Sequence, residues 1–283
     1  MNDASIALGF AVFIWWFSTG IVILLNRMSR SAVALSLALS SFLGVAAMVG
    51  LAHTAQQTGV TGAYCAFTCA LLVWGWNELS FLTGWITGPR TTALPIEAVG
   101  WPRFVQSLRA VLWHELAILL VGCAIVAITW QAPNQVGLGT YLVLWIMRTS
   151  AKLNLFFGVR NLSEAFLPAH LAYLESFFRR RRLNAFFPFA VALASVCLWW
   201  LVTYASNPLA SQAQTVGAVL VGTLLALAIV EHLMLVLPVD TTALWRWALR
   251  KQKSDLNTAG FEPQAPTVLA PAMDKHDKLF QIH

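Results

Sequence analysis

Long apolar stretches are the feature that most limits how this chain can fold. Seven of them approach or exceed the roughly 20 mainly apolar residues that a helix needs to cross a bilayer: residues 5–26, 32–53, 63–87, 110–130, 136–158, 184–205 and 214–237. Only 11% of the residues are charged and 58% are hydrophobic, against roughly 25% charged in ordinary soluble domains. The sequence therefore predicts an all-α, polytopic membrane protein, built as a bundle of about seven transmembrane helices over residues 1–237.

The formal net charge of +6 is concentrated in alternate connections between these stretches. The connections "HTAQQTGVTG", "QAPNQ" and "SNPLASQAQ" contain no Lys or Arg. The other connections and the C-terminal flank contain Arg27, Arg30, Arg90, Arg103, Arg109, Arg179, Arg180, Arg181, Arg182, Arg246, Arg250, Lys251 and Lys253. Because basic loops stay in the cytoplasm, we expect a multi-pass membrane protein with its N-terminus outside and its C-terminus in the cytoplasm. The basic excess then sets topology, and nucleic acid is not an expected partner.

One cytoplasmic connection, residues 161–182, has the pattern of an amphipathic helix. Apolar residues recur in it at helical spacing, and Asn161 with Glu164 resembles an N-cap with its reciprocal acid. Pro168 is positioned to bend the helix. The segment ends in Arg179, Arg180, Arg181 and Arg182, which predict contact with anionic headgroups or with a partner. The alternative is that it only anchors the connection.

A second basic segment follows the last apolar stretch. Residues 238–253 predict a juxtamembrane amphipathic helix, with Asp240 as its N-cap and with Trp245 and Trp247 at the membrane surface or against a partner. Residues 254–283, with three prolines, predict a disordered cytoplasmic tail.

Charged and histidine side chains interrupt four of the apolar stretches, in or near the half of the bilayer that we assign to the cytoplasmic side. They are Glu78, His114, Glu115, Arg148, Lys152, Glu231 and His232. Insertion of one such charge at the middle of a helix costs roughly 2.5–3.5 kcal/mol. Arg148 and Lys152 lie four residues apart on one helix face, where like charges repel, so we expect Glu78, Glu115 and Glu231 to be their counter-ions. Three carboxylates against two cations leave one negative charge in excess.

Several roles for this polar layer follow from its composition. It can hold helices together through polar contacts, or it can form a path for protons or a small solute. A metal site is less favoured, because in His114–Glu115 and Glu231–His232 the acid and the base are adjacent and diverge around the helix by roughly 100°. His114 or His232 can also serve as the axial ligand of a porphyrin-type pigment. Trp74, Trp76, Trp85, Trp113 and Trp145 surround the layer and can line a flat ligand or simply pack.

The sequence contains none of the common signatures of soluble enzymes. It lacks G-x-S-x-G, a P-loop, H-E-x-x-H and a dinucleotide fingerprint. No internal repeat is apparent, which weighs against an inverted-repeat transporter. No catalytic residue is assigned, and the metal, if the layer holds one, is unknown.

Three strings resemble one family of membrane proteins. They are "WGWNELSFLTGWITGPR", "RTSAKLNLFFGVRNLSEAFLPAHLAYLESFFRRRRLNAFFP" and "EHLMLVLPVDTTALWRWALR", and they resemble the PuhE family of phototrophic bacteria over residues 5 to about 250. The resemblance implies a membrane-embedded assembly factor for the photosynthetic reaction centre and its light-harvesting ring, linked to bacteriochlorophyll supply. It also implies reaction-centre and light-harvesting subunits as partners beside the lipid bilayer, and bacteriochlorophyll or a related tetrapyrrole as the candidate cofactor.

Two alternatives from other functional classes stay open at this point. One is a membrane enzyme of tetrapyrrole metabolism that uses the buried Glu and His side chains. The other is a transporter, for which the charged layer would form part of a polar path.

Overall fold

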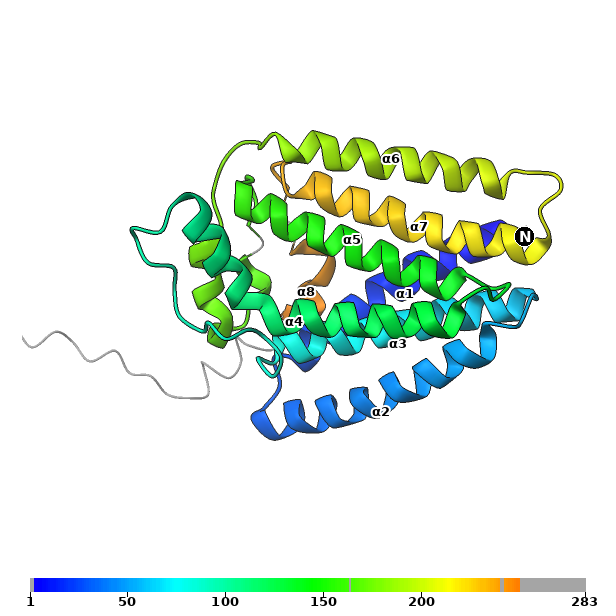
Figure 1. Ribbon diagram of the computed structural model, residues 1–283, viewed down its shortest axis with the longest axis horizontal. Coiled ribbons are helices and arrows are strands. Elements are labelled where there is room, and N and C mark those ends of the chain that lie inside the picture. The colour runs from blue at the N-terminus through cyan, green and yellow to red at the C-terminus, as the bar shows by residue number, and fades with distance from the viewer. Residues whose placement is uncertain (1–2, 163, 240–241, 250–283) are drawn as a thin grey trace, which may run out of the picture. The chain divides into compact units, whose positions relative to one another are not determined.

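The chain folds around seven long helices in a computed structural model that describes residues 3–162, 164–239 and 242–249. Figure 1 shows them side by side, and the described residues contain no named strand. The seven are α1 (Asp3–Leu25), α2 (Arg30–Thr54), α3 (Val60–Leu82), α4 (Gly100–Thr129), α5 (Val136–Phe157), α6 (Phe186–Ala205) and α7 (Gln212–Met234). The prediction of an all-α, polytopic bundle is confirmed.

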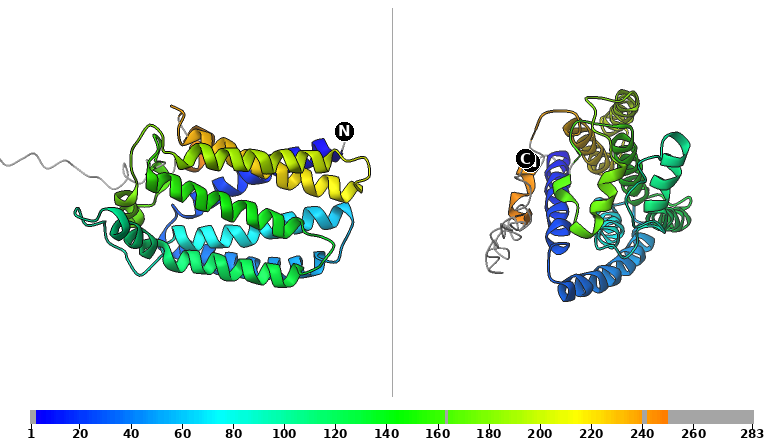
Figure 2. Two further views of the ribbon diagram at one scale, coloured as in Figure 1. Left: turned by 45° about the horizontal axis from the view of Figure 1, so that its top comes forward. Right: turned by 90° about the vertical axis from the view of Figure 1, so that its left-hand side faces the viewer.

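Six of these helices are long and apolar enough to cross a membrane, and α5 is the exception. Arg148, Lys152 and Asn154 lower its hydropathy, although it has 22 residues. It packs against α3, α4, α6 and α7, so it stands inside the bundle (Figure 2). Its neighbours shield its polar side chains from lipid, which explains how a transmembrane bundle can include a helix of this composition.

Local sequence explains where several helices begin and end. α7 begins with a capping box, in which the Ser211 side chain accepts from the Gln214 backbone N–H and the Gln214 side chain accepts from the Ser211 backbone N–H. α5 ends at Phe157 and is followed by Gly158, whose φ of 118° favours glycine. α3 ends at Leu82, five residues before the predicted stretch does, because the chain turns there with Gly84 at φ 80°.

Helix α4 begins at Gly100, ten residues before the predicted stretch at 110. With 30 residues it is about 45 Å long, which exceeds the roughly 30 Å hydrocarbon core. The connection before it folds back along the helix, since the His114 backbone N–H donates to the Thr87 carbonyl at 2.9 Å. Gly88 is required there, because a Cβ would overlap the Arg109 carbonyl oxygen.

The segment 161–182 is not one amphipathic helix, as predicted, but contains two short 3₁₀ helices, η1 (Glu164–Phe166) and η2 (Ala169–Phe177). Pro168 separates them and forms the N-cap of η2. The apolar residues of η2 face the protein, where Leu171 and Phe177 pack with Phe81 and Ala110. The apolar residues of this segment therefore pack against the bundle in 3₁₀ turns, and do not form one continuous helical face.

Asn161 does not form the predicted N-cap with Glu164, and the arginines follow η2 outside any helix. The Asn161 side-chain amide donates to the carbonyls of Met234, at 2.6 Å, and Leu237, at 2.5 Å, so it caps the end of α7. Glu164 instead pairs with Arg180 at 3.0 Å. The backbone of the arginine run lies beside the end of α5, with the Val159 N–H donating to the Arg179 carbonyl at 3.1 Å. Arg179, Arg180, Arg181 and Arg182 are thus held in an extended segment.

The juxtamembrane segment forms η3 (Ala243–Trp245) and α8 (Arg246–Leu249), and Asp240 and residues 250–283 lie outside the described residues. Trp245 is buried against α1: its ring nitrogen donates to the Trp16 carbonyl at 3.1 Å, and the Trp16 ring nitrogen donates to the Leu244 carbonyl at 3.0 Å. Trp247 is 39% exposed and also packs on Trp16. Trp245 is therefore fixed inside the protein rather than at its surface.

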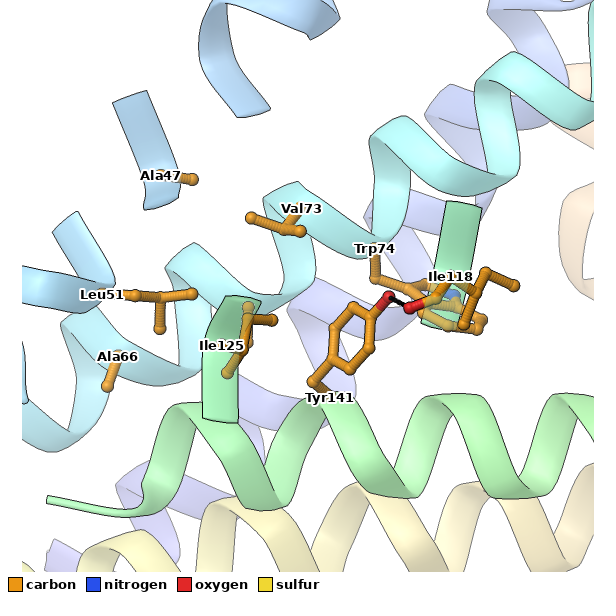
Figure 3. Close-up of a cluster of buried hydrophobic side chains, with 9 residues drawn as sticks. Ala47, Leu51, Ala66, Val73, Trp74, Ile118, Ile125 and Tyr141 are labelled. Carbon is orange, nitrogen blue, oxygen red and sulfur yellow. Dashed lines mark hydrogen bonds between the residues drawn. The ribbon is translucent and has the colours of Figure 1, made fainter. Parts of the chain in front are cut away.

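The main buried cluster lies between α2, α3, α4 and α5 (Figure 3). Small side chains such as Ala66 and Ala70 bring the helices close, and the large Tyr141 side chain fills the centre. Its hydroxyl donates to the Ile118 carbonyl at 2.9 Å, so no polar atom of this ring is left unpaired in the apolar core.

Arg103 joins three elements at the end of the bundle where α4 begins and α5 ends. Its side chain is buried and donates to the carbonyls of Phe156 at 3.0 Å and Phe177 at 2.6 Å. The guanidinium carbon also lies 3.9 Å from the centre of the Phe156 ring. One side chain thereby ties α4 to the end of α5 and to η2.

We expect Arg103→Lys to lower the thermal stability of the detergent-purified protein, with a loss of about 1–3 kcal/mol for the charged hydrogen bonds. An ammonium group is a point donor and cannot bond both carbonyls while stacking on Phe156. Arg109→Lys, at an exposed position of the same helix, is the control and should leave the melting temperature unchanged. Equal shifts for the two variants would contradict the assigned role of Arg103.

Candidate functional site

The charged side chains of the polar layer surround one cavity of about 810 Å³ inside the bundle. Glu78 reaches it from α3, Glu115 from α4, Arg148 and Lys152 from α5, and Glu231 from α7. The remaining wall is mostly apolar and includes side chains from α1 and from η3. A cavity of this size is within the usual range for small-molecule sites.

Arg148 forms a two-point ion pair with Glu78. Its Nε donates to Oε1 at 3.2 Å and its Nη2 donates to Oε2 at 2.9 Å. A bidentate arginine–carboxylate pair of this kind is stronger than a single charged hydrogen bond. The Arg148 side chain is nevertheless 41% exposed, and because it lines the cavity it retains hydrogen-bond donors there.

Lys152, one helical turn further along α5, pairs with Glu115 of α4, its Nζ donating to Oε1 at 2.5 Å. Both side chains remain about one quarter exposed, 22% and 23%. The two cations therefore have separate carboxylate partners on two different helices, and their mutual repulsion on α5 is offset on both sides.

Glu231 is the third carboxylate, and it has a different partner. It accepts a hydrogen bond from the ring nitrogen of Trp15 at 3.0 Å. Within the described part of the chain it forms no ion pair with Lys or Arg. The excess negative charge expected from the sequence therefore falls on Glu231.

His232 points from α7 toward α5 and is occupied at both ring nitrogens. Nδ1 donates to the Ala228 carbonyl at 2.9 Å, because a carbonyl can only accept, and Nε2 lies 2.9 Å from the Ser150 hydroxyl. In the neutral ring Nε2 accepts that hydroxyl hydrogen. His232 is only 2% exposed, so it acts as a bridge between two helices.

His114 is fully buried and does not line the cavity. Its ring stacks on Phe81 with 4.4 Å between the centres, and neither ring nitrogen has a hydrogen-bond partner among the described residues. Neither histidine thus offers a free nitrogen to the cavity, and the residues present do not fit histidine ligation of a pigment there.

Only two of the five tryptophans that were predicted to surround the layer line the cavity. Trp74 and Trp145 line the cavity, whereas Trp85 and Trp113 are exposed and Trp76 bonds to Ser41. Among the described residues, no three His, Cys, Asp or Glu side chains gather in an arrangement able to hold a metal ion.

Comparison with protein families gives a match over nearly the whole chain. Residues 1–256 match the family described as Protein of unknown function (DUF3623). The chain belongs to this family. It is also 37% identical over 262 residues to an "Uncharacterized 30.4 kDa protein in puhA 5'region" of Rhodobacter capsulatus, a match that covers 88% of this chain and 92% of that protein. No solved structure matches the chain.

Sequence reasoning missed two contacts beside the cavity in this member of the DUF3623 family: Trp15 binds Glu231, and Ser150 holds His232. It named Trp245 but did not place it in the cavity wall. The pair Trp15–Trp16 in the middle of an apolar helix was the available signal, since Trp in membrane helices prefers the interfaces.

The ion pairs predict a specific pattern of rescue. We expect Arg148→Met to reduce membrane accumulation several-fold, because it leaves Glu78 buried without its partner. Adding Glu78→Gln should recover most of the protein, and adding Glu115→Gln should not. For Lys152→Met the rescuing partner should be Glu115→Gln. Immunoblots of membrane fractions measure all five variants, and equal rescue of Arg148→Met by either carboxamide would mean that only net charge matters.

Proposed function

We propose that this chain is an inner-membrane assembly factor for the photosynthetic reaction centre and its light-harvesting ring. The observation that carries the proposal is the relative named for its position in the puhA 5' region, which is similar over almost the full length of both chains. The resemblance of three long strings to the PuhE family points the same way.

The geometry supports a role that requires contact with hydrophobic molecules inside the bilayer. Six apolar helices give the chain an extensive lipid-facing surface, and the cavity provides a recessed surface bounded in part by aromatic side chains. Assembly of a pigment–protein complex requires both subunits and pigment in the membrane. A link to bacteriochlorophyll supply is therefore part of the proposal, with reaction-centre and light-harvesting subunits as partners.

The proposed orientation has a periplasmic N-terminus. The connections with basic side chains, 83–99 and 158–185, gather at the end of the bundle away from the N-terminus (Figure 1). At the opposite end the Asn134 backbone N–H donates to the Ala55 carbonyl at 3.1 Å, within connections that have no Lys or Arg.

A topology test follows from this arrangement. A phosphatase reporter should be active when inserted between residues 131 and 135 and inactive when fused after Arg250, because alkaline phosphatase folds only in the periplasm, and basic loops are retained in the cytoplasm. A fluorescent protein at the same two places should give the reverse result. Periplasmic activity after Arg250 would overturn the orientation.

The assembly role is tested in a phototrophic host from which the native relative has been deleted. We expect the deletion to lower reaction-centre and core-antenna absorbance, and the chain supplied on a plasmid to restore it, with immunoblots to confirm its level. Normal absorbance in the deletion strain would contradict the proposal. The enzyme alternative predicts a different result, namely accumulation of a pigment precursor while the reaction-centre polypeptides are still inserted.

A further inference from the structure

The cavity has an unequal distribution of charge. Arg148 and Lys152 are each matched by a carboxylate at 2.9 Å and 2.5 Å. Glu231 receives one hydrogen bond, from the neutral indole N–H of Trp15 at 3.0 Å, and the Arg148 charge that also attracts it is already paired with Glu78. A carboxylate at this depth without a cation is costly, and a single neutral hydrogen bond offsets only part of that cost. Balancing Glu231 requires one further positive charge, which the described residues do not supply. It must come from a proton or from a bound molecule.

The wall beside these charges leaves room for such a molecule. Gly75 of α3 lines the cavity, and a Cβ built there would meet no atom within 4 Å. Trp15, Trp74, Trp145 and Trp245 line it as well, from four different elements. Tryptophan faces favour flat or positively charged groups. The space is therefore bounded by aromatic rings and is adjacent to an unmatched carboxylate.

We propose that the cavity binds a flat, apolar molecule with an electropositive centre, which lies against Glu231. The centre can be an organic cation or a metal held in a neutral macrocycle, and both present the same chemistry to a carboxylate. The site goes beyond the assembly role, since it is a property of the isolated protein and does not depend on reaction-centre subunits.

Arg148 and Lys152 add a second element of selectivity. Each uses only some of its N–H groups in its ion pair, so donors remain on the same cavity wall. A ligand with carbonyl or ester oxygens at its rim can accept from them while its centre faces Glu231. The site then selects against purely hydrocarbon molecules such as lipid chains.

Binding is measured with the purified full chain in nanodiscs by saturable quenching of tryptophan fluorescence. Two matched pairs of probes separate the two sources of positive charge. One pair is 9-aminoacridine, a cation at pH 8, with neutral acridine. The other is zinc protoporphyrin dimethyl ester with the metal-free ester. We expect the electropositive member of at least one pair to bind about tenfold or more tightly than its partner.

Glu231→Gln tests the carboxylate directly. Glutamine keeps the volume and can still accept from Trp15, so the fold should persist while the affinity for the electropositive probe falls about tenfold. Glu97→Gln, on the exposed connection before α4, is the matched control and should bind as the original chain does.

Gly75→Phe tests the location. The added ring enters open space in the wall and should prevent saturable quenching without a clash. Gly9→Phe makes the same change on α1, where a Cβ also meets nothing within 4 Å. Gly9 does not line the cavity, so this control variant should bind as the original chain does. Gel filtration of both variants confirms folding.

Each outcome decides the proposal. Preference for only one electropositive probe supports it and identifies the source as an organic cation or a metal-bearing macrocycle. Equal binding within both pairs, undiminished affinity in Glu231→Gln, undiminished binding in Gly75→Phe, or no saturable quenching by any probe would overturn it. None of these results bears on reaction-centre levels in cells, so the assembly proposal stands or falls separately.

Discussion

The positive charges on α5 are the constraint on which the rest of the bundle depends. An Arg and a Lys on one face of a membrane helix cannot face lipid, so α5 must be surrounded by other helices. Those helices must also supply anions at matching depth, which they do through Glu78 of α3 and Glu115 of α4. The composition that makes α5 the least apolar of the long helices thus also fixes its place among α3, α4, α6 and α7.

The same constraint divides the bundle into two halves with different packing. In the half without charges, small residues allow close approach: Gly137 of α5 lies against Leu51 and Ala66, and Gly217 of α7 lies against Val136. Such contacts are typical of membrane helices, which associate through packing rather than through the hydrophobic effect. In the charged half, long side chains stand between the backbones, and the space that remains is the cavity. Charge and cavity therefore have one structural origin.

The sequence predicted the elements that depend on residue type alone. Apolar length identified the helices, and charge balance indicated that carboxylates would face Arg148 and Lys152. It did not predict partners that depend on how distant segments meet. Arg103 was counted only as a topology signal, yet it is buried under η2. Trp245 was assigned to the membrane surface or to a partner, yet it packs on α1. In both cases the polar end of the side chain donates to backbone carbonyls, and no sequence pattern identifies those acceptors.

The distinction between a structural layer and a binding site rests on Glu231. A layer that only joins helices needs balanced charges and close packing, and the Arg148, Lys152 and His232 contacts satisfy both needs. An additional carboxylate beside open space satisfies neither, and an apolar residue at position 231 would join α7 to α1 at lower cost. Because Glu231 is held by Trp15 rather than by a cation, its charge stays available to the cavity. In the structure the two ion pairs join α5 to α3 and α4, and the remaining carboxylate lines the cavity.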